Sequence, residues 1–258
     1  MVVKGRVRVM SVRLVFEPRK TVSWDEFSVH PPYSIAVDGY CSGQPRSTPD
    51  GLRLNINHHE DCDRIATRSS CAQALHLVKM GLFDTFSKDG KPEATIYAND
   101  CDQDVTWATY ILRHPQHIDR PRLKAMVQLE DLLDMSAGLY PIKKRWHLLK
   151  KLLWVSEPYT NARADGSLHA MDSDAMTALV DGMHRRIRDT LFGRGREVLP
   201  DDRFEVIAEF PRWSFIKEIG THARIGVAQK GIKAFVSLVA YGPKRCRYVI
   251  VRRSRFMN

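Results

Sequence analysis

Hydrophobic and polar positions in the first 140 residues form short apolar runs separated by longer stripes of helical periodicity. The apolar runs end in polar clusters, which is typical of strands buried in a parallel sheet. The stripes between them begin near Ser, Thr or Asp and end near Gly or Pro. The pattern predicts strands at 7–18, 34–37, 52–56 and 94–98, and helices at 69–80, 105–114 and 122–135. This order predicts an α/β fold with a parallel or mixed sheet flanked by helices.

The second half of the chain has a different pattern. Residues 143–154 predict a basic amphipathic helix, and the polar stretch 155–170 predicts a linker because it holds Pro158 and Gly166. A helical stripe follows over 176–191, then a strand at 204–210 and a hairpin whose turn contains Gly242-Pro243. We therefore expect a second, smaller α+β domain, with boundaries at 1–156 and 157–258.

The composition is that of an ordinary folded protein. The 258 residues are 43% hydrophobic and 27% charged, with no apolar run near the roughly 18 residues that a membrane span needs. The first ten residues lack the apolar region of a secretory signal. The five cysteines are odd in number and lack close CxxC spacing, which argues against a disulfide framework. These features predict a soluble, cytoplasmic protein that does not enter a membrane.

Charge is divided unevenly along the chain. Residues 1–140 carry a net charge of −1 and residues 141–258 a net charge of +11. A basic half can bind an anionic ligand, and it can equally be a solvated surface that keeps the protein soluble. Charge alone leaves both interpretations open.

The clearest chemical signal is a cluster of histidines and acids at the predicted strand ends. His58 and His59 follow one strand, Asp38 follows another, and Asp100, Asp102 and Asp104 follow a third. Imidazole and carboxylate groups together suit divalent ions of the Mn, Fe, Zn or Mg class, and two such ions can clamp a phosphodiester. Because the carboxyl ends of strands gather at one edge of an α/β sheet, we expect these side chains to converge. Acidic residues at these positions are also common as helix N-caps.

Two motifs resemble those of the DHH phosphoesterase superfamily: Val37-Asp38-Gly39, and Asn57-His58-His59 with the run 63–74 after it. The segment Leu132 to Gly138, which contains Asp134, is similar to the later aspartate motif of that family. The resemblance implies hydrolysis of a phosphodiester or nucleotide-type substrate with a divalent metal, Mn²⁺ being favoured and Mg²⁺ the alternative. It implies metal ligands at Asp38, Asn57, His59, Asp104 and Asp134, and catalytic roles for His58, Asp100 and Asp102. In this interpretation His58 faces the substrate phosphate.

The sequence departs from the family pattern in three ways. Asn57 replaces the aspartate of the central motif and brings no negative charge, the N-terminal histidine motif has no counterpart, and the acidic cluster 99–104 lies between motifs. The alternative function is a catalytically silent module that binds a nucleotide or a nucleic-acid end. The oligomeric state stays open, a homodimer included.

The basic half contains candidate substrate-binding residues. The small-residue segment 220–226 is similar to a substrate loop of the family, and an Arg-Arg-Ser sequence follows the last strand. Guanidinium and hydroxyl groups suit phosphate. The candidates are His222, Arg224, Arg252, Arg253 and Ser254. In Lys143-Lys144-Arg145-Trp146, cations adjoin an aromatic ring that could stack a base of a short nucleic acid; the alternative is a core indole with solvated lysines.

Overall fold

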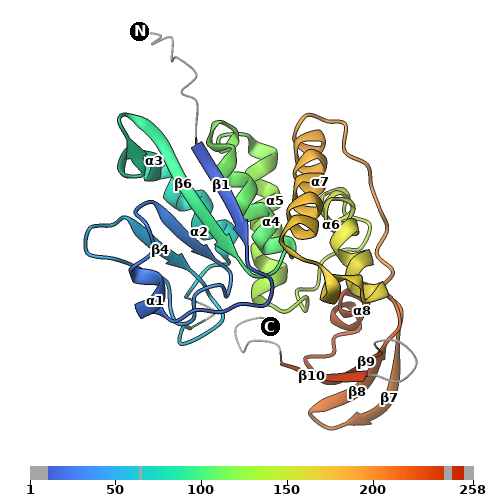
Figure 1. Ribbon diagram of the computed structural model, residues 1–258. Coiled ribbons are helices and arrows are strands. Elements are labelled where there is room, and N and C mark those ends of the chain that lie inside the picture. Colours follow the sequence, from blue (N-terminus) through green and yellow to red (C-terminus); the bar gives the residue numbers. More distant parts are fainter. Residues whose placement is uncertain (1–10, 64–65, 241–245, 253–258) are drawn as a thin grey trace. The chain divides into compact units, whose positions relative to one another are not determined.

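In the computed structural model, which describes residues 11–63, 66–240 and 246–252, four parallel strands form the centre of the first sheet (Figure 1). Their order is β1 (Ser11–Phe16), β6 (Lys91–Ala98), β2 (Ser34–Val37) and β4 (Arg53–Ile56). Two short strands make the sheet mixed: β3 (Arg46–Ser47) pairs antiparallel with β4, and β5 (Ser87–Lys88) pairs antiparallel with β6. All four residues of β2 are buried, as its central place requires. The parallel strands end at one edge of the sheet.

Helices flank this sheet, and side-chain caps fix where they begin. Ser69 caps α2 (Ser70–Lys79) and Asp102 caps α4 (Gln103–Arg113), each by accepting a hydrogen bond from a first-turn amide. Figure 1 shows α2 and α4 on the same side of the sheet, and the two helices contact each other. The remaining helical segments of this part are short: α1 (Trp24–Ser28), α3 (Leu82–Thr85) and the 3₁₀ turn η1 (Pro115–His117). The α/β fold with a mixed sheet flanked by helices is confirmed.

A second sheet has the strand order β10-β9-β8-β7. Its strands are β7 (Phe204–Phe210), β8 (Trp213–Glu218), β9 (Ala234–Ala240) and β10 (Cys246–Arg252). The pairs β7·β8 and β9·β10 are antiparallel and β8·β9 is parallel, because α8 (Ala223–Gln229) connects β8 to β9. The predicted hairpin of the last two strands is confirmed, while its turn at Gly242-Pro243 lies outside the described residues.

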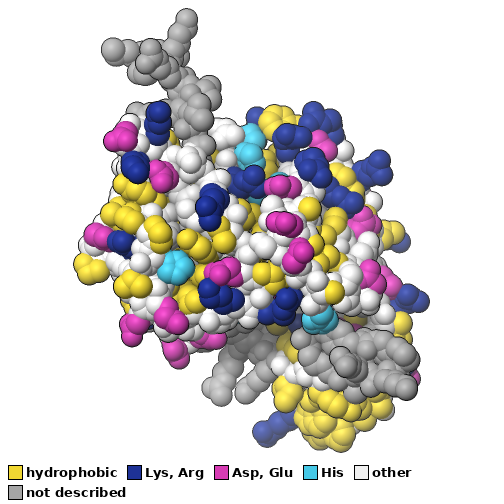
Figure 2. Space-filling model, in the orientation of Figure 1, with side chains coloured by type: hydrophobic (Ala, Val, Ile, Leu, Met, Phe, Trp, Pro, Cys, Tyr) yellow, Lys and Arg dark blue, Asp and Glu magenta, His cyan; other side chains and the backbone are white. Residues whose placement is uncertain are grey.

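One face of the second sheet forms a hydrophobic core with α8. Ile216, Phe235 and Val251 pack there with Val227 of the helix. Other apolar side chains of these strands are exposed, including Phe210, Trp213, Tyr248 and Ile250. Figure 2 shows hydrophobic side chains gathered over this sheet.

The chain divides into two compact units, and the division differs from the predicted cut after residue 156. Unit 1 comprises 1–123 and 172–180, and unit 2 comprises 124–171 and 181–258. Two of the three boundaries fall inside helices, because α5 (Pro121–Met135) and α7 (Ser173–Leu191) each contribute residues to both units. The third boundary, between residues 171 and 172, lies just before α7. Unit 2 also holds α6 (His147–Asp165) and the 3₁₀ turn η2 (Ser167–Ala170).

Two local predictions for unit 2 are wrong. The expected linker 155–170 is the second half of α6 followed by η2, and Pro158 lies inside that helix. Buried apolar residues on either side of Pro158, Val155 and Ala162 among them, anchor the helix across the missing N–H. The expected loop 220–226 includes the first turn of α8.

Among the described residues, the structure contains no helix that is both long enough and apolar enough to cross a lipid bilayer.

Candidate metal centre

Asp38 lies in a tight turn at the end of β2. Both turn residues have left-handed backbone angles, with φ of +45° at Asp38 and +81° at Gly39. Gly39 adopts a positive φ without strain, whereas Asp38 has a side chain and is held at this angle only by contacts that fix the turn. Asn99, which follows β6, supplies it: its Nδ2 donates a hydrogen bond of 2.9 Å to the carbonyl oxygen of Gly39. The end of one strand therefore positions the carboxylate at the end of its neighbour.

Asn57 organises the loop after β4. Its Oδ1 accepts hydrogen bonds from the backbone N–H of His58 (2.8 Å) and His59 (3.1 Å), and its Nδ2 donates to the carbonyl oxygen of Gly43 (3.1 Å). The side chain is completely buried. The side-chain oxygen Oδ1 of Asn57 thus already accepts two backbone hydrogen bonds. Asn57 positions the two histidines, in place of the metal-binding role predicted from the sequence.

The two histidines converge on one carboxylate oxygen. His59 Nε2 lies 2.6 Å and His58 Nε2 lies 3.1 Å from Oδ1 of Asp38. The two imidazole rings are 4.3 Å apart between centroids and are tilted by 38°. Because Asn57 Oδ1 accepts the amides of both histidines, the two imidazoles reach the same carboxylate.

The burial of the two histidines also corrects their predicted roles. The side chain of His58 is fully buried, whereas that of His59 is 38% exposed. A fully buried imidazole cannot face a substrate phosphate in this conformation. His59 is the histidine that a ligand in solvent can approach, and His58 lies behind it.

The electrostatics of the cluster favour ionised Asp38. Burial alone would raise the pKa of Asp38, but hydrogen bonds from His58 and His59 lower it well below its usual range. The pKa of Asp102 shifts in the opposite direction. Burial and the neighbouring carboxylates of Asp38, Asp100 and Asp104 raise it well above the usual value. Four acids therefore interact at the edge of the first sheet, as the strand-end positions predict.

Asp104 and Asp100 also accept hydrogen bonds from backbone amides, as Asp102 does in capping α4. Asp104 accepts hydrogen bonds from the first two amides of α2, from Ser70 N to Oδ2 (2.7 Å) and from Cys71 N to Oδ1 (2.9 Å). Its Oδ2 is also 3.5 Å from His58 Nε2. Asp100 accepts a hydrogen bond from the amide of Cys101. Asp104 is thus primarily the anchor between α4 and α2.

The donor set around Asp38 fits a divalent cation. One ligand atom from each of Asp38, His58 and His59 lies within 4.8 Å of the others. Ligand atoms about 2.1 Å from an ion sit roughly 3 Å apart, which is close to the observed separations from Asp38. Imidazole nitrogen with carboxylate oxygen suits Mn²⁺, Fe²⁺ or Zn²⁺ better than Ca²⁺. Asp134, the remaining predicted ligand, lies on α5 in unit 2 and outside this three-residue group.

The predicted substrate-binding residues of unit 2 have structural contacts of their own. The guanidinium of Arg224 binds the carboxylate of Glu218 (3.3 Å) and the carbonyl oxygen of Ala137 (3.2 Å). His222 is the N-cap residue of α8, and burial lowers the pKa of its imidazole, with the charge of Arg163 acting in the same direction. The side chain of Arg224 therefore helps to attach α8 within unit 2, and the amide of His222 donates a hydrogen bond to the carbonyl oxygen of Asp201 (2.9 Å). Arg252 is the last residue of β10, while Arg253 and Ser254 lie outside the described residues.

Close packing accounts for the glycines of the segment 220–226. A Cβ atom at Gly220 would lie 2.1 Å from the carbonyl oxygen of Asp201, and one at Gly226 would lie 2.3 Å from that of Asp202. These glycines let the chain before β7 pass directly against α8. Packing against this chain is thus sufficient to require glycine at both positions, and a substrate-binding role of the segment stays a prediction.

The residues that position the site were not identified as such from the sequence. Asn99 lies beside the predicted acids, but its bond to Gly39 spans 60 positions in the chain. The signal that could have found it is the turn-forming pair Asp38-Gly39, which needs an external donor to hold its carbonyl.

Comparisons with protein-family models, with curated proteins and with solved structures found no match for this chain.

Proposed function

We propose that unit 1 binds a divalent cation, Mn²⁺ in the first instance and Mg²⁺ as the alternative, and that the protein hydrolyses a phosphodiester or nucleotide-type substrate. The observation that carries the proposal is the convergence of His58 and His59 on Oδ1 of Asp38. The resemblance of the surrounding motifs to the DHH phosphoesterase superfamily supports the same reaction class.

The residues of the cluster have separable tasks in this proposal. A bound divalent cation would supply Lewis-acid activation of the phosphoryl group and of the attacking water. Asp38, His58 and His59 hold the cation, and the exposed edge of His59 marks the side from which substrate approaches. Asp102 carries a carboxyl whose pKa is raised by burial and by its acidic neighbours, so it is suited to accept a proton beside the phosphate.

One observation favours the second candidate function, a catalytically silent module that binds a nucleotide or a nucleic-acid end. Asn57 stands where the family motif has an aspartate, and its oxygen is committed to the amides of His58 and His59. The cluster therefore has one carboxylate fewer for a second ion. A single bound ion is compatible with binding as well as with hydrolysis.

Calorimetric titration with Mn²⁺ tests the metal site. We expect wild type to bind and His59→Ala to lose about 10-fold or more in affinity, because a ligand is removed. His76→Ala is the matched control, since His76 is an exposed histidine of α2 in the same unit. Absence of binding at millimolar Mn²⁺, or an equal loss in the control, contradicts the proposal.

Turnover of bis(p-nitrophenyl) phosphate and of a 5′-phosphorylated dinucleotide separates the two candidates. Hydrolysis that requires Mn²⁺ and is lost in Asp102→Asn supports the enzyme. Metal binding without turnover above background supports the silent module.

A further inference from the structure

A pocket of about 470 Å³ lies in unit 2, in the segment that joins α5 to α6. Its volume is within the range of roughly 300–1,000 Å³ that is typical of small-molecule sites. Its lining is mainly apolar. The lining residues are Tyr140, Pro141, Ile142, Lys143, Arg145 and Trp146.

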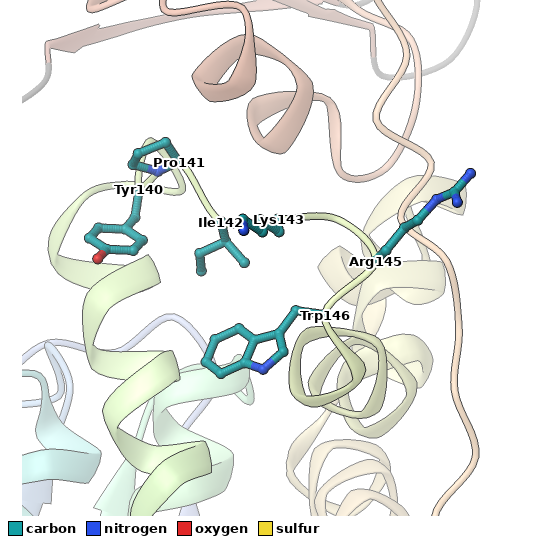
Figure 3. A pocket seen from close by; sticks show the side chains of 6 residues that line it. All are labelled: Tyr140, Pro141, Ile142, Lys143, Arg145 and Trp146. Atoms are coloured by element: carbon teal, nitrogen blue, oxygen red, sulfur yellow. The ribbon is translucent and has the colours of Figure 1, made fainter.

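Aromatic side chains reach into this pocket. Figure 3 shows the indole of Trp146 extending below Ile142 toward the side on which Tyr140 lies. Trp146 is 41% exposed, although burying an indole is strongly favourable. An exposed indole over an apolar cavity presents a flat face on which a planar ring can stack.

Uncompensated positive charge borders the same pocket. Lys144 forms an ion pair with Asp202, with 3.1 Å between Nζ and Oδ2, so its charge is compensated. Lys143 and Arg145, by contrast, are exposed and have no ion-pair partner among the residues that the structure describes. Figure 3 shows the Arg145 guanidinium extending outward from the pocket, where an anionic group at the rim could meet it.

The segment is held in place before any ligand binds. The amide of Tyr140 donates to Ser136 Oγ (2.9 Å), and Gln229 Nε2 donates to the carbonyl oxygen of Ile142 (2.8 Å). The amide of Trp146 donates to the carbonyl oxygen of Lys143 (2.9 Å). A preformed pocket loses less conformational entropy on binding than a mobile loop does.

We propose that this pocket binds a nucleotide, with the base stacked on Trp146 and the phosphate at Lys143 and Arg145. The apolar lining and the indole account for the base, and the two exposed cations are complementary to the phosphate. The inference rests on the proposed function for its substrate class, because it names which part of such a substrate unit 2 recognises. The nucleotide is either free or the terminal residue of a short oligonucleotide.

Calorimetric titration with AMP in the presence of EDTA tests the pocket without any contribution from metal. We expect Trp146→Ala to weaken AMP binding by about 10-fold, which corresponds to about 1.4 kcal/mol, and Trp146→Phe to retain most of it. Trp213→Ala is the matched control, because that indole is 39% exposed and lies on β8 of the same unit. Wild-type affinity in Trp146→Ala, or an equal loss in Trp213→Ala, overturns the proposal.

The charge requirement is tested with the double variant Lys143→Ala/Arg145→Ala. We expect weaker binding of AMP and unchanged binding of adenosine, which lacks the phosphate. Arg212→Ala/Lys233→Ala removes the same charge from exposed positions outside the pocket and should bind AMP as wild type does. Equal losses in the two double variants would mean general attraction to a basic surface and would overturn the assigned site.

One further titration completes the design. The dinucleotide pApA, compared with AMP, distinguishes a free nucleotide from a strand end by which of the two binds more tightly. Failure of AMP to bind, with Mn²⁺ binding intact, overturns the pocket alone. AMP binding in EDTA without any Mn²⁺ binding overturns the metal centre alone.

Discussion

His59 Nε2 lies 2.6 Å from Oδ1 of Asp38, although the two residues follow different strands of the first sheet. The contact forms because β2 and β4 are adjacent and parallel, with Val37 paired to Ile56 in register. Each strand therefore ends at the same level, and the residues just beyond the ends meet. The same oxygen of Asp38 is 3.1 Å from His58, so a single carboxylate organises the pair of histidines.

Replacing each histidine should separate structural support from ligand contact. His58→Ala removes a fully buried ring and should destabilise the protein by about 2–4 kcal/mol, whereas His59→Ala removes a partly exposed one and should cost less than about 1 kcal/mol. Urea denaturation without metal measures both free energies of unfolding. Equal losses would show that the difference in burial does not decide the stability.

Asn57→Asp should destabilise the protein by about 1–3 kcal/mol. The bond from Nδ2 to the carbonyl oxygen of Gly43 would become a contact between two acceptors, in a completely buried place. Asn161→Asp on the exposed surface of α6 is the control for the added charge. If Asn57→Asp kept the wild-type stability and bound Mn²⁺ more tightly, position 57 would be a metal ligand, as the sequence predicted.

Asp104→Asn should weaken the attachment of α2. The carboxylate uses both oxygens to accept the amides of Ser70 and Cys71, and an amide side chain can offer only one oxygen. Loss of one charge-assisted hydrogen bond should cost about 1.5–3 kcal/mol in thermal or urea unfolding. Hydrogen exchange at the first turn of α2 should rise in this variant, and protection equal to wild type would contradict the anchoring role.

Acid should destabilise unit 1 through His30. Burial lowers the pKa of this imidazole below 6.5; the charge of Lys20 acts in the same direction and that of Glu17 opposes it. The unfolded chain then takes up the proton more readily than the folded chain, so stability falls as the pH is lowered through 6.5. His30 packs at 4.8 Å from the rings of Phe27 and Tyr97. In the variant His30→Phe, the phenyl ring can pack against Phe27 and Tyr97 but has no group that takes up a proton.

The check is urea denaturation of wild type and His30→Phe between pH 8 and pH 5. The variant should lose less stability over this interval than wild type. His76→Phe, at an exposed position, should keep the wild-type dependence. Parallel curves for wild type and His30→Phe would exclude His30 as the titrating group.

Gly226→Ala should destabilise unit 2 by about 1–3 kcal/mol, because the new methyl group would overlap the carbonyl oxygen of Asp202. Gly182→Ala in α7 is the matched control, and we expect it to raise the free energy of unfolding instead of lowering it. A Cβ atom there would lie 3.7 Å from the end of Arg185, and alanine favours a helix by about 0.5–1 kcal/mol over glycine. Thermal unfolding measures both. If Gly226→Ala unfolded at the wild-type temperature, close packing would not explain the glycine, and the interpretation of this segment as a substrate loop would be favoured.

Local signals in the sequence were sufficient for most of unit 1. The run Ser34–Val37 is buried throughout and apolar after Ser34, because β2 has neighbours on both sides. Ser69 marks the start of α2 by capping it. These features act within a few residues, so the sequence carries them directly. The edge of the sheet at which Asp38 and the histidines meet follows from the same strand order.

Tertiary packing decided what local signals could not. Pro158 predicts a break in the chain, yet α6 continues through it because buried residues on both sides hold the helix. Gly220 and Gly226 suggest a flexible loop, yet they are close contacts between α8 and the segment before β7. For the two glycines the deciding partners, Asp201 and Asp202, lie about twenty residues earlier in the chain.

The sequence by itself determined the α/β fold and the presence of histidines and acids at the strand ends. Only the tertiary structure decided that His58 is buried, that His59 is exposed and that Asn57 serves the backbone. The direction of each side chain depends on hydrogen bonds across the fold, from Asn57 to Gly43 and from Asn99 to Gly39. Such bonds form only once the strands have paired, so no periodicity in the chain encodes them.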